Sequence, residues 1–92
     1  MKKHKSLNNK TVEQFKLGIS LRLNRDIKNI KLIGSRITGN YKKDSDLDVC
    51  ILDRRINMDK IKPFIYIKLF NITCEIHYVD SFEYSYIKYY GV

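Results

Sequence analysis

Residues 34–48 read Gly-Ser-Arg-Ile-Thr-Gly-Asn-Tyr-Lys-Lys-Asp-Ser-Asp-Leu-Asp, and the pattern of this segment is the most informative about the fold. A short run rich in β-branched residues, Ile30 to Ile33, stands before it and predicts a strand that ends at Gly34. Residues 46–52 alternate acidic and apolar side chains, which is typical of a strand with one buried face. The sequence therefore predicts two strands joined by a polar loop that contains glycine.

Acidic and small residues gather at the two ends of this loop. Asp46 and Asp48 are two residues apart on a strand, so their side chains project from the same side. Such close like charges repel unless a cation lies between them, and carboxylate oxygens suit magnesium. Gly34 lets backbone amides approach a phosphate, and Ser35 adds a hydroxyl donor. A metal site and a phosphate site joined through one loop are what phosphoryl or nucleotidyl transfer needs.

An amphipathic helix is predicted before the first strand. Thr11 and Gln14 form a capping-box pattern, from which the helix is expected to run to about Asp26. Its apolar stripe, at three- and four-residue spacing, consists of Val12, Phe15, Ile19, Leu23 and Ile27. Residues 1–10 are expected to form a basic, flexible tail, and residues 11–92 a single domain.

The segment from Met58 to Phe70 fits two patterns. Helical spacing is met by Ile61, Phe64, Ile65 and Leu69. Alternation typical of a strand is met by Ile65, Ile67 and Leu69. We favour a helix that begins near Asp59, after a turn over residues 53–57, because Pro63 then stands in its first turn.

Residues 72–79 predict a further strand, in which Glu75 has the same outward parity as the two aspartates. Glu75 adds a third carboxylate if the two strands are neighbours. His77 shares that face, and we expect it to be a solvated histidine. Asp80 and Glu83 predict the start of a last helix, which carries Phe82, Tyr86 and Tyr90. The predicted order defines an α/β (α+β) fold, a small mixed sheet with helices packed on one face.

Composition narrows the classes of function. The net charge is +8, but the 13 lysines are dispersed along the chain, so nucleic acid is not the ligand we favour. No apolar run approaches the roughly 20 residues of a membrane span, and the charged N-terminus does not resemble a signal peptide. We therefore expect a cytoplasmic protein without membrane association. Cys50 and Cys74 should point to opposite faces of the sheet, where they cannot form a disulfide.

The run from Gly34 to Val49 resembles the signature of the DNA polymerase beta-like nucleotidyltransferase superfamily, which is Gly-Ser, ten residues, then Asp-x-Asp. The arginine after Ser35, Gly39 and Ser45 match as well. The chain is most similar to the minimal nucleotidyltransferases, which include antitoxin partners of HEPN-domain toxins. In that branch a third acid follows in an apolar context on a later strand, where this chain has Glu75.

The resemblance implies a nucleotidyltransferase fold and a role for each matching residue. Gly34, Ser35 and Arg36 would bind the triphosphate of an NTP such as ATP. The metal-binding and catalytic residues would be Asp46, Asp48 and Glu75, with Mg²⁺ as the ion. The implied reaction transfers a nucleoside monophosphate, AMP by analogy, to a hydroxyl of a protein, such as a HEPN-type toxin, or of a small molecule. Glu75 departs from the usual aspartate, and its extra methylene moves the carboxylate outward.

Three other functions are compatible with parts of the sequence. A calcium loop that opens at Asp44 fails, because Val49 and Arg55 stand where it needs glycine and glutamate. A catalytically inert module of the same fold would act by binding a partner through the aromatic C-terminal segment. A small basic nucleic-acid binder would rest on net charge alone.

Overall fold

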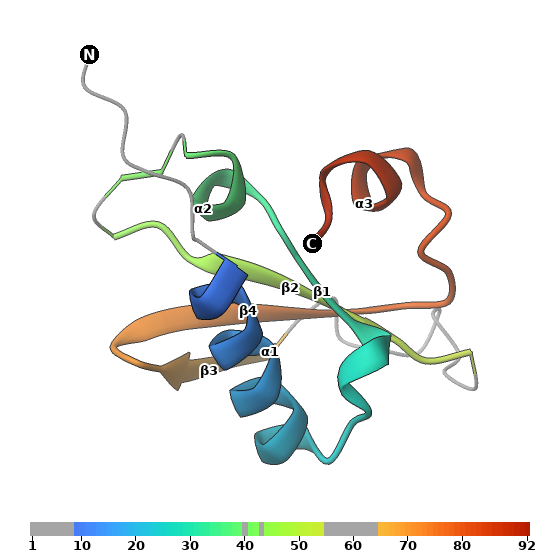
Figure 1. Cartoon of the computed structure of the whole chain (residues 1–92), viewed down its shortest axis with the longest axis horizontal. Coiled ribbons are helices and arrows are strands. Elements are labelled where there is room, and N and C mark those ends of the chain that lie inside the picture. Colours follow the sequence, from blue (N-terminus) through green and yellow to red (C-terminus); the bar gives the residue numbers. More distant parts are fainter. Residues whose placement is uncertain (1–8, 40, 43, 55–64) are drawn as a thin grey trace.

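The computed structural model describes residues 9–39, 41–42, 44–54 and 65–92. This part of the chain forms three α-helices, one 3-10 helix and four strands (Figure 1). In chain order they are α1 (Asn9–Leu23), the 3-10 helix η1 (Ile27–Asn29), β1 (Ile30–Ile33), α2 (Ser35–Thr38), β2 (Leu47–Leu52), β3 (Ile65–Leu69), β4 (Ile72–Val79) and α3 (Ser85–Tyr90). The predicted α+β class is confirmed.

The four strands form one mixed sheet in the order β1-β2-β4-β3. β1 pairs with β2 antiparallel, β2 with β4 parallel, and β4 with β3 antiparallel. In this register Asp48 of β2 lies between Ile33 of β1 and Glu75 of β4. Tyr66 of β3 lies opposite Glu75 on the other side of β4. The pairing therefore places one residue from each of the four strands in a single row across the sheet.

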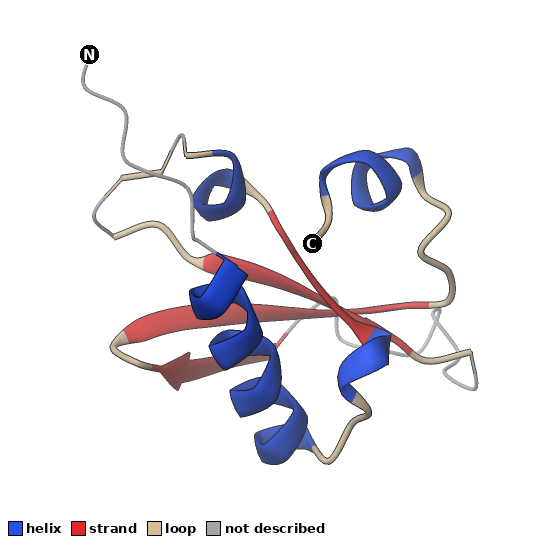
Figure 2. Ribbon diagram, viewed as in Figure 1, coloured by secondary structure: helices blue, strands red, loops and turns tan. Residues whose placement is uncertain are grey.

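The core lies between α1 and one face of the sheet. Figure 2 shows α1 crossing that face, and its apolar stripe supplies three buried side chains: Val12, Phe15 and Ile19. The sheet contributes the alternate residues of its two central strands and of β1: Ile30, Leu32, Leu47, Val49, Ile51, Cys74 and Ile76. Burial of these side chains is the dominant favourable term in folding a domain this small. The strand alternation read from the sequence is confirmed for β2 and β4.

β3 and β4 form a hairpin whose tip is held against α1. The two turn residues, Phe70 and Asn71, both have positive φ, at 52° and 62°, as a type I′ hairpin turn requires. Positive φ is unusual for a bulky residue, and here the Phe70 ring meets the Phe15 ring edge to face at 5.3 Å between centroids. This contact fixes the hairpin, and Tyr66 with it, against the rest of the fold.

Three predictions about element bounds are wrong. Residues 65–69 form strand β3 and no helix, because pairing with β4 satisfies their backbone; residues 58–64 lie outside the described ranges. α1 begins at Asn9, before Thr11, and ends at Leu23, so Ile27 belongs to η1.

The last helix also begins later than predicted. α3 has Tyr84 as its N-cap residue, and Asp80 instead accepts a hydrogen bond from the Tyr84 hydroxyl at 2.8 Å. The buried residue of this helix is Ile87, whereas Tyr86 and Tyr90 are exposed. The C-terminal Val92 exchanges two backbone hydrogen bonds with Leu32, at 2.8 and 2.9 Å, so the chain end extends the sheet beside β1.

Within the described ranges, no helix has both the length and the apolar character that crossing a membrane requires.

Candidate functional site

Two carboxylates and an imidazole meet on the face of the sheet opposite α1. Asp48 and Glu75 are partners across the parallel pair β2–β4, so their side chains project from the same face. His77 lies two residues further along β4, and its Nε2 is 3.7 Å from Asp48 Oδ1 and 3.7 Å from Glu75 Oε2. One ligand atom from each of the three residues lies within 4.8 Å of the others. The side chains are partly buried, so a small ion would reach them from solvent.

Electrostatics make this cluster a good cation site. Burial, followed by the neighbouring Glu75 carboxylate, raises the pKa of Asp48 from 3.8 to about 6. His77 acts in the opposite direction. Two carboxylates this close are stabilised by a proton or a cation between them, and their oxygens suit Mg²⁺. The residues of this chain therefore fit a divalent ion at Asp48 and Glu75.

Gly34 stands beside this cluster, at the point where β1 ends. Its φ of 91° and ψ of −167° belong to a region that only glycine adopts readily. A Cβ at this position would overlap with the Asp48 carboxylate. Glycine is thus required twice, for the backbone conformation and for the close approach of Asp48. Ser35 follows Gly34 as the partly exposed first residue of α2.

Asp46 and Arg36 are not part of the carboxylate cluster formed by the described residues. Asp46 precedes β2 and is partly exposed, and it lies outside the cluster of three that the described residues form. Its charge helps to raise the pKa of Tyr66. Arg36 is 8% exposed; its Nε donates to the Ser45 carbonyl oxygen at 2.7 Å, and its guanidinium lies 4.6 Å from the centre of the Tyr41 ring. These contacts tie α2 to the residue before Asp46.

Two residues of this neighbourhood are not among the site residues that the sequence predicts. His77 was expected to be merely solvated, although its parity with Glu75 already placed it on the same face. Tyr66 was assigned to a helix, whereas the alternation of Ile65, Ile67 and Leu69 would have placed it on the carboxylate face. Its hydroxyl is 3.5 Å from Glu75 Oε1. Partial loss of hydration, together with the charges of Glu75 and Asp46, raises the pKa of Tyr66.

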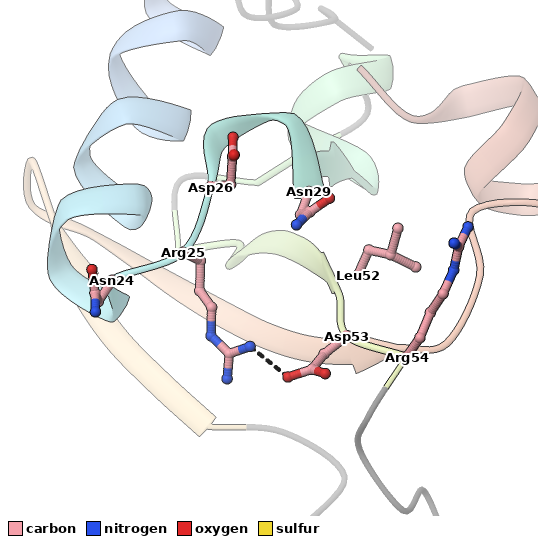
Figure 3. A pocket seen from close by; sticks show the side chains of 7 residues that line it. All are labelled: Asn24, Arg25, Asp26, Asn29, Leu52, Asp53 and Arg54. Atoms are coloured by element: carbon pink, nitrogen blue, oxygen red, sulfur yellow. Dashed lines mark hydrogen bonds and ion pairs between the residues drawn. The ribbon is translucent and has the colours of Figure 1, made fainter.

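A separate polar pocket of about 350 Å³ lies at the other end of β2 (Figure 3). The ion pair between Arg25 Nη1 and Asp53 Oδ2, 2.5 Å apart, lies in its wall, and the guanidinium is 5.2 Å from the centre of the Tyr78 ring. Asp53 follows Asp48 by five residues, about 16 Å along an extended strand. This pocket is therefore distinct from the carboxylate cluster, and its charged groups join β2 to the end of α1.

The two cysteines are free thiols, as predicted. Both are buried, and burial raises the pKa of each to about 11. They are therefore packing residues and poor nucleophiles at neutral pH.

Gly34 and Ser35 follow β1, the Asp46-Leu47-Asp48 run leads into the neighbouring strand β2, and Glu75 lies on the parallel strand β4. This is the arrangement that the resemblance to nucleotidyltransferases implies. The family model described as "Nucleotidyltransferase domain" matches residues 12–79, more than half of the chain. The chain therefore belongs to the nucleotidyltransferase domain family. Comparisons with curated proteins and with solved structures give no match.

Proposed function

We propose that this domain binds a nucleoside triphosphate with Mg²⁺ and transfers the nucleoside monophosphate, AMP by family analogy, to a hydroxyl group. The acceptor is a protein or a small molecule, and a HEPN-type toxin is the protein class that the family suggests. The observation that carries the proposal is the apposition of Asp48 and Glu75 across β2 and β4, directly beside Gly34. Family membership over residues 12–79 supports the same reaction type.

Each residue of the site has a distinct role in this proposal. Asp46, Asp48 and Glu75 would hold the Mg²⁺ ion. Gly34 and Ser35 contact the phosphates through backbone amides and the Ser35 hydroxyl. Arg36 supports the loop that carries Asp46, through its hydrogen bond to Ser45. Mg²⁺, when bound, neutralises phosphate charge and makes the α-phosphorus more electrophilic.

Proton transfer falls to the carboxylate that faces the acceptor. The acceptor hydroxyl attacks the α-phosphorus, the bond to the bridging oxygen of the β-phosphate breaks, and pyrophosphate leaves. Glu75 accepts the hydroxyl proton, since it lies on β4 between Asp48 of β2 and the edge strand β3. His77, whose Nε2 is 3.7 Å from Glu75 Oε2, lies next to that carboxylate.

Titration calorimetry with ATP tests the proposal. We expect wild type to bind ATP in the presence of MgCl₂, to lose this binding with EDTA, and to lose it in Asp48→Ala. Glu13→Ala is the matched control, because Glu13 is an exposed acid on α1, away from the site. ATP binding that is unchanged in Asp48→Ala would contradict the metal assignment. Binding of an oligonucleotide, but of no triphosphate, at moderate salt would favour a basic nucleic-acid binder.

A partner-binding module without catalysis is the second candidate, and one observation favours it. Large apolar and aromatic side chains are exposed on α1, on the β3–β4 turn and along α3: Leu17, Leu21, Phe70, Tyr84, Tyr86, Tyr89 and Tyr90. Exposed patches of this kind are frequent at protein interfaces. Under this alternative, partner binding is unaffected by EDTA and by Asp48→Ala. If Asp48→Ala no longer neutralised a toxin partner, the alternative of a module without catalysis would be contradicted.

A further inference from the structure

Tyr66 brings a hydroxyl group of the chain itself to the carboxylate cluster. It stands opposite Glu75 in the β3–β4 register, and partners in an antiparallel pair project from the same face. Its Oη is 3.5 Å from Glu75 Oε1, a long contact that a small rotation of either side chain shortens to a hydrogen bond. The side chain is 53% exposed, so a ligand reaches the hydroxyl from solvent.

We propose that Tyr66 is an acceptor for the nucleotidyl group, so that the domain nucleotidylates itself in cis. The inference rests on the proposed function and names an acceptor for it. Tyr66 Oη forms a bond to the α-phosphorus of the bound triphosphate, and the bond from this phosphorus to the bridging oxygen breaks. Pyrophosphate leaves with the bonding electron pair, and the phenolic proton passes to the Glu75 carboxylate. The product is a tyrosine phosphodiester that carries one nucleoside monophosphate.

The environments of the other tyrosines set Tyr66 apart. The Tyr84 hydroxyl donates to Asp80, outside the carboxylate cluster. Tyr78 has the opposite parity to Glu75 on β4, and its ring lies against Arg25. The remaining four lie in the loop after α2 or on α3: Tyr41, Tyr86, Tyr89 and Tyr90. Among the seven tyrosines, all of which the structure describes, Tyr66 is the one paired with a carboxylate of the candidate site.

The hairpin makes this an intramolecular reaction of fixed geometry. β3 is held to β4 by the ladder from Ile65–Ile76 to Leu69–Ile72, and the turn is anchored by Phe70 against α1. A nucleophile held beside its base reacts at a high effective concentration. The same placement gives the modification a consequence, because a nucleotide on Tyr66 occupies the space beside Glu75 where an external acceptor must bind. Modification therefore limits transfer to other acceptors.

The test uses the full chain with MgCl₂ and a mixture of the four ribonucleoside triphosphates labelled on the α-phosphate. Covalent label is followed by intact-mass spectrometry and located by peptide mapping. We expect label on the peptide that contains Tyr66, approaching one nucleotide per chain. Tyr66→Phe and Glu75→Gln should each reduce it at least tenfold, whereas Tyr84→Phe, an equally exposed tyrosine, should label as wild type does. The initial rate per chain should not change on tenfold dilution of the protein.

Two outcomes overturn the inference, and calorimetry distinguishes them. Asp48-dependent binding of a triphosphate without label on Tyr66, or with equal label in Tyr66→Phe, removes the inference and leaves the proposed function intact. Absence of triphosphate binding removes both. Circular dichroism of Tyr66→Phe should show a folded variant, because the change removes one oxygen atom from a side chain that is 53% exposed.

Discussion

Replacement of Asp48 by asparagine should stabilise the metal-free protein, although it damages the candidate site. The pKa of Asp48 is raised by about two units, from 3.8 to about 6, by burial and by the Glu75 carboxylate. At about 1.4 kcal/mol for each unit, the ionised form costs about 3 kcal/mol at pH 7 relative to the unfolded chain. Asparagine keeps the shape of the side chain and removes the charge. Allowing for the partial exposure of Asp48, we expect a gain of about 1–2 kcal/mol.

Proton binding at Asp48 determines how the stability difference between the two proteins changes with pH. Between pH 4 and pH 6 the folded wild type binds more protons at Asp48 than the unfolded chain does, so this residue lowers stability as pH rises through that window. The advantage of Asp48→Asn should therefore be absent at pH 4 and complete above pH 7. Comparison of the two proteins at each pH cancels the titration of the remaining acids, which both share.

Thermal unfolding with EDTA measures the effect. For a domain of 60–100 residues, 1 kcal/mol moves Tm by about 4–8 °C, so the expected increase at pH 7.5 is roughly 5–15 °C. MgCl₂ should raise the Tm of wild type and leave that of Asp48→Asn unchanged, because ligands stabilise the state that binds them. Glu13→Gln removes an exposed acid from this +8 chain and is expected to give no stabilisation. A variant that is less stable than wild type at pH 7.5 in EDTA, or a gain that persists unchanged at pH 4, would refute the reasoning.

Three further predictions concern the surrounding fold. Gly34→Ala should cost about 2 kcal/mol or more in urea unfolding and abolish triphosphate binding, because its φ is 91° and its Cβ overlaps with the neighbouring carboxylate; wild-type stability would contradict the close approach. Arg25→Ala should cost about 3 kcal/mol, since it removes the ion-pair partner of Asp53, whose side chain is 7% exposed, whereas Asp53→Asn should cost about 1 kcal/mol because Arg25 is 29% exposed; the reverse order would be inconsistent with this ion pair. Cys50 and Cys74 should react with a maleimide only after unfolding, because burial raises the pKa of each to about 11, and rapid labelling of the native protein at pH 7 would exclude that account.

The parts of the fold that follow from local periodicity were predictable. The period-2 alternation in residues 46–52 and 72–79 gave both central strands, and the helical stripe of Val12, Phe15 and Ile19 gave the buried face of α1. These patterns hold because one face of each element must be buried against the other layer. Side-chain parity within each strand was sufficient to place Asp48 and Glu75 on one face.

Pairing between strands was not predictable in the same way. Asp48 meets Glu75 because β2 and β4 are parallel and in one particular register, which tertiary packing selects. The apolar residues of 65–69 fit helix and strand equally, and the open edge of β4 decided between them by offering backbone partners. Because residues 65–69 fit both patterns, the position of Tyr66 beside the carboxylates was not predictable. In a helix its side chain would point in a different direction.

Glu75 on β4 belongs to the candidate cation site and also contacts the neighbouring strand. The extra methylene moves the carboxylate away from the strand, yet Glu75 remains within the cluster formed with Asp48 and His77. Its reach also brings Oε1 toward Tyr66 and Oε2 toward His77, so one carboxylate contacts the neighbouring strand and its own. A shorter aspartate on β4 would retract from both contacts. The longer side chain is therefore consistent with a carboxylate that both completes the cation site and faces the acceptor, which is what a base for nucleotidyl transfer to a hydroxyl requires.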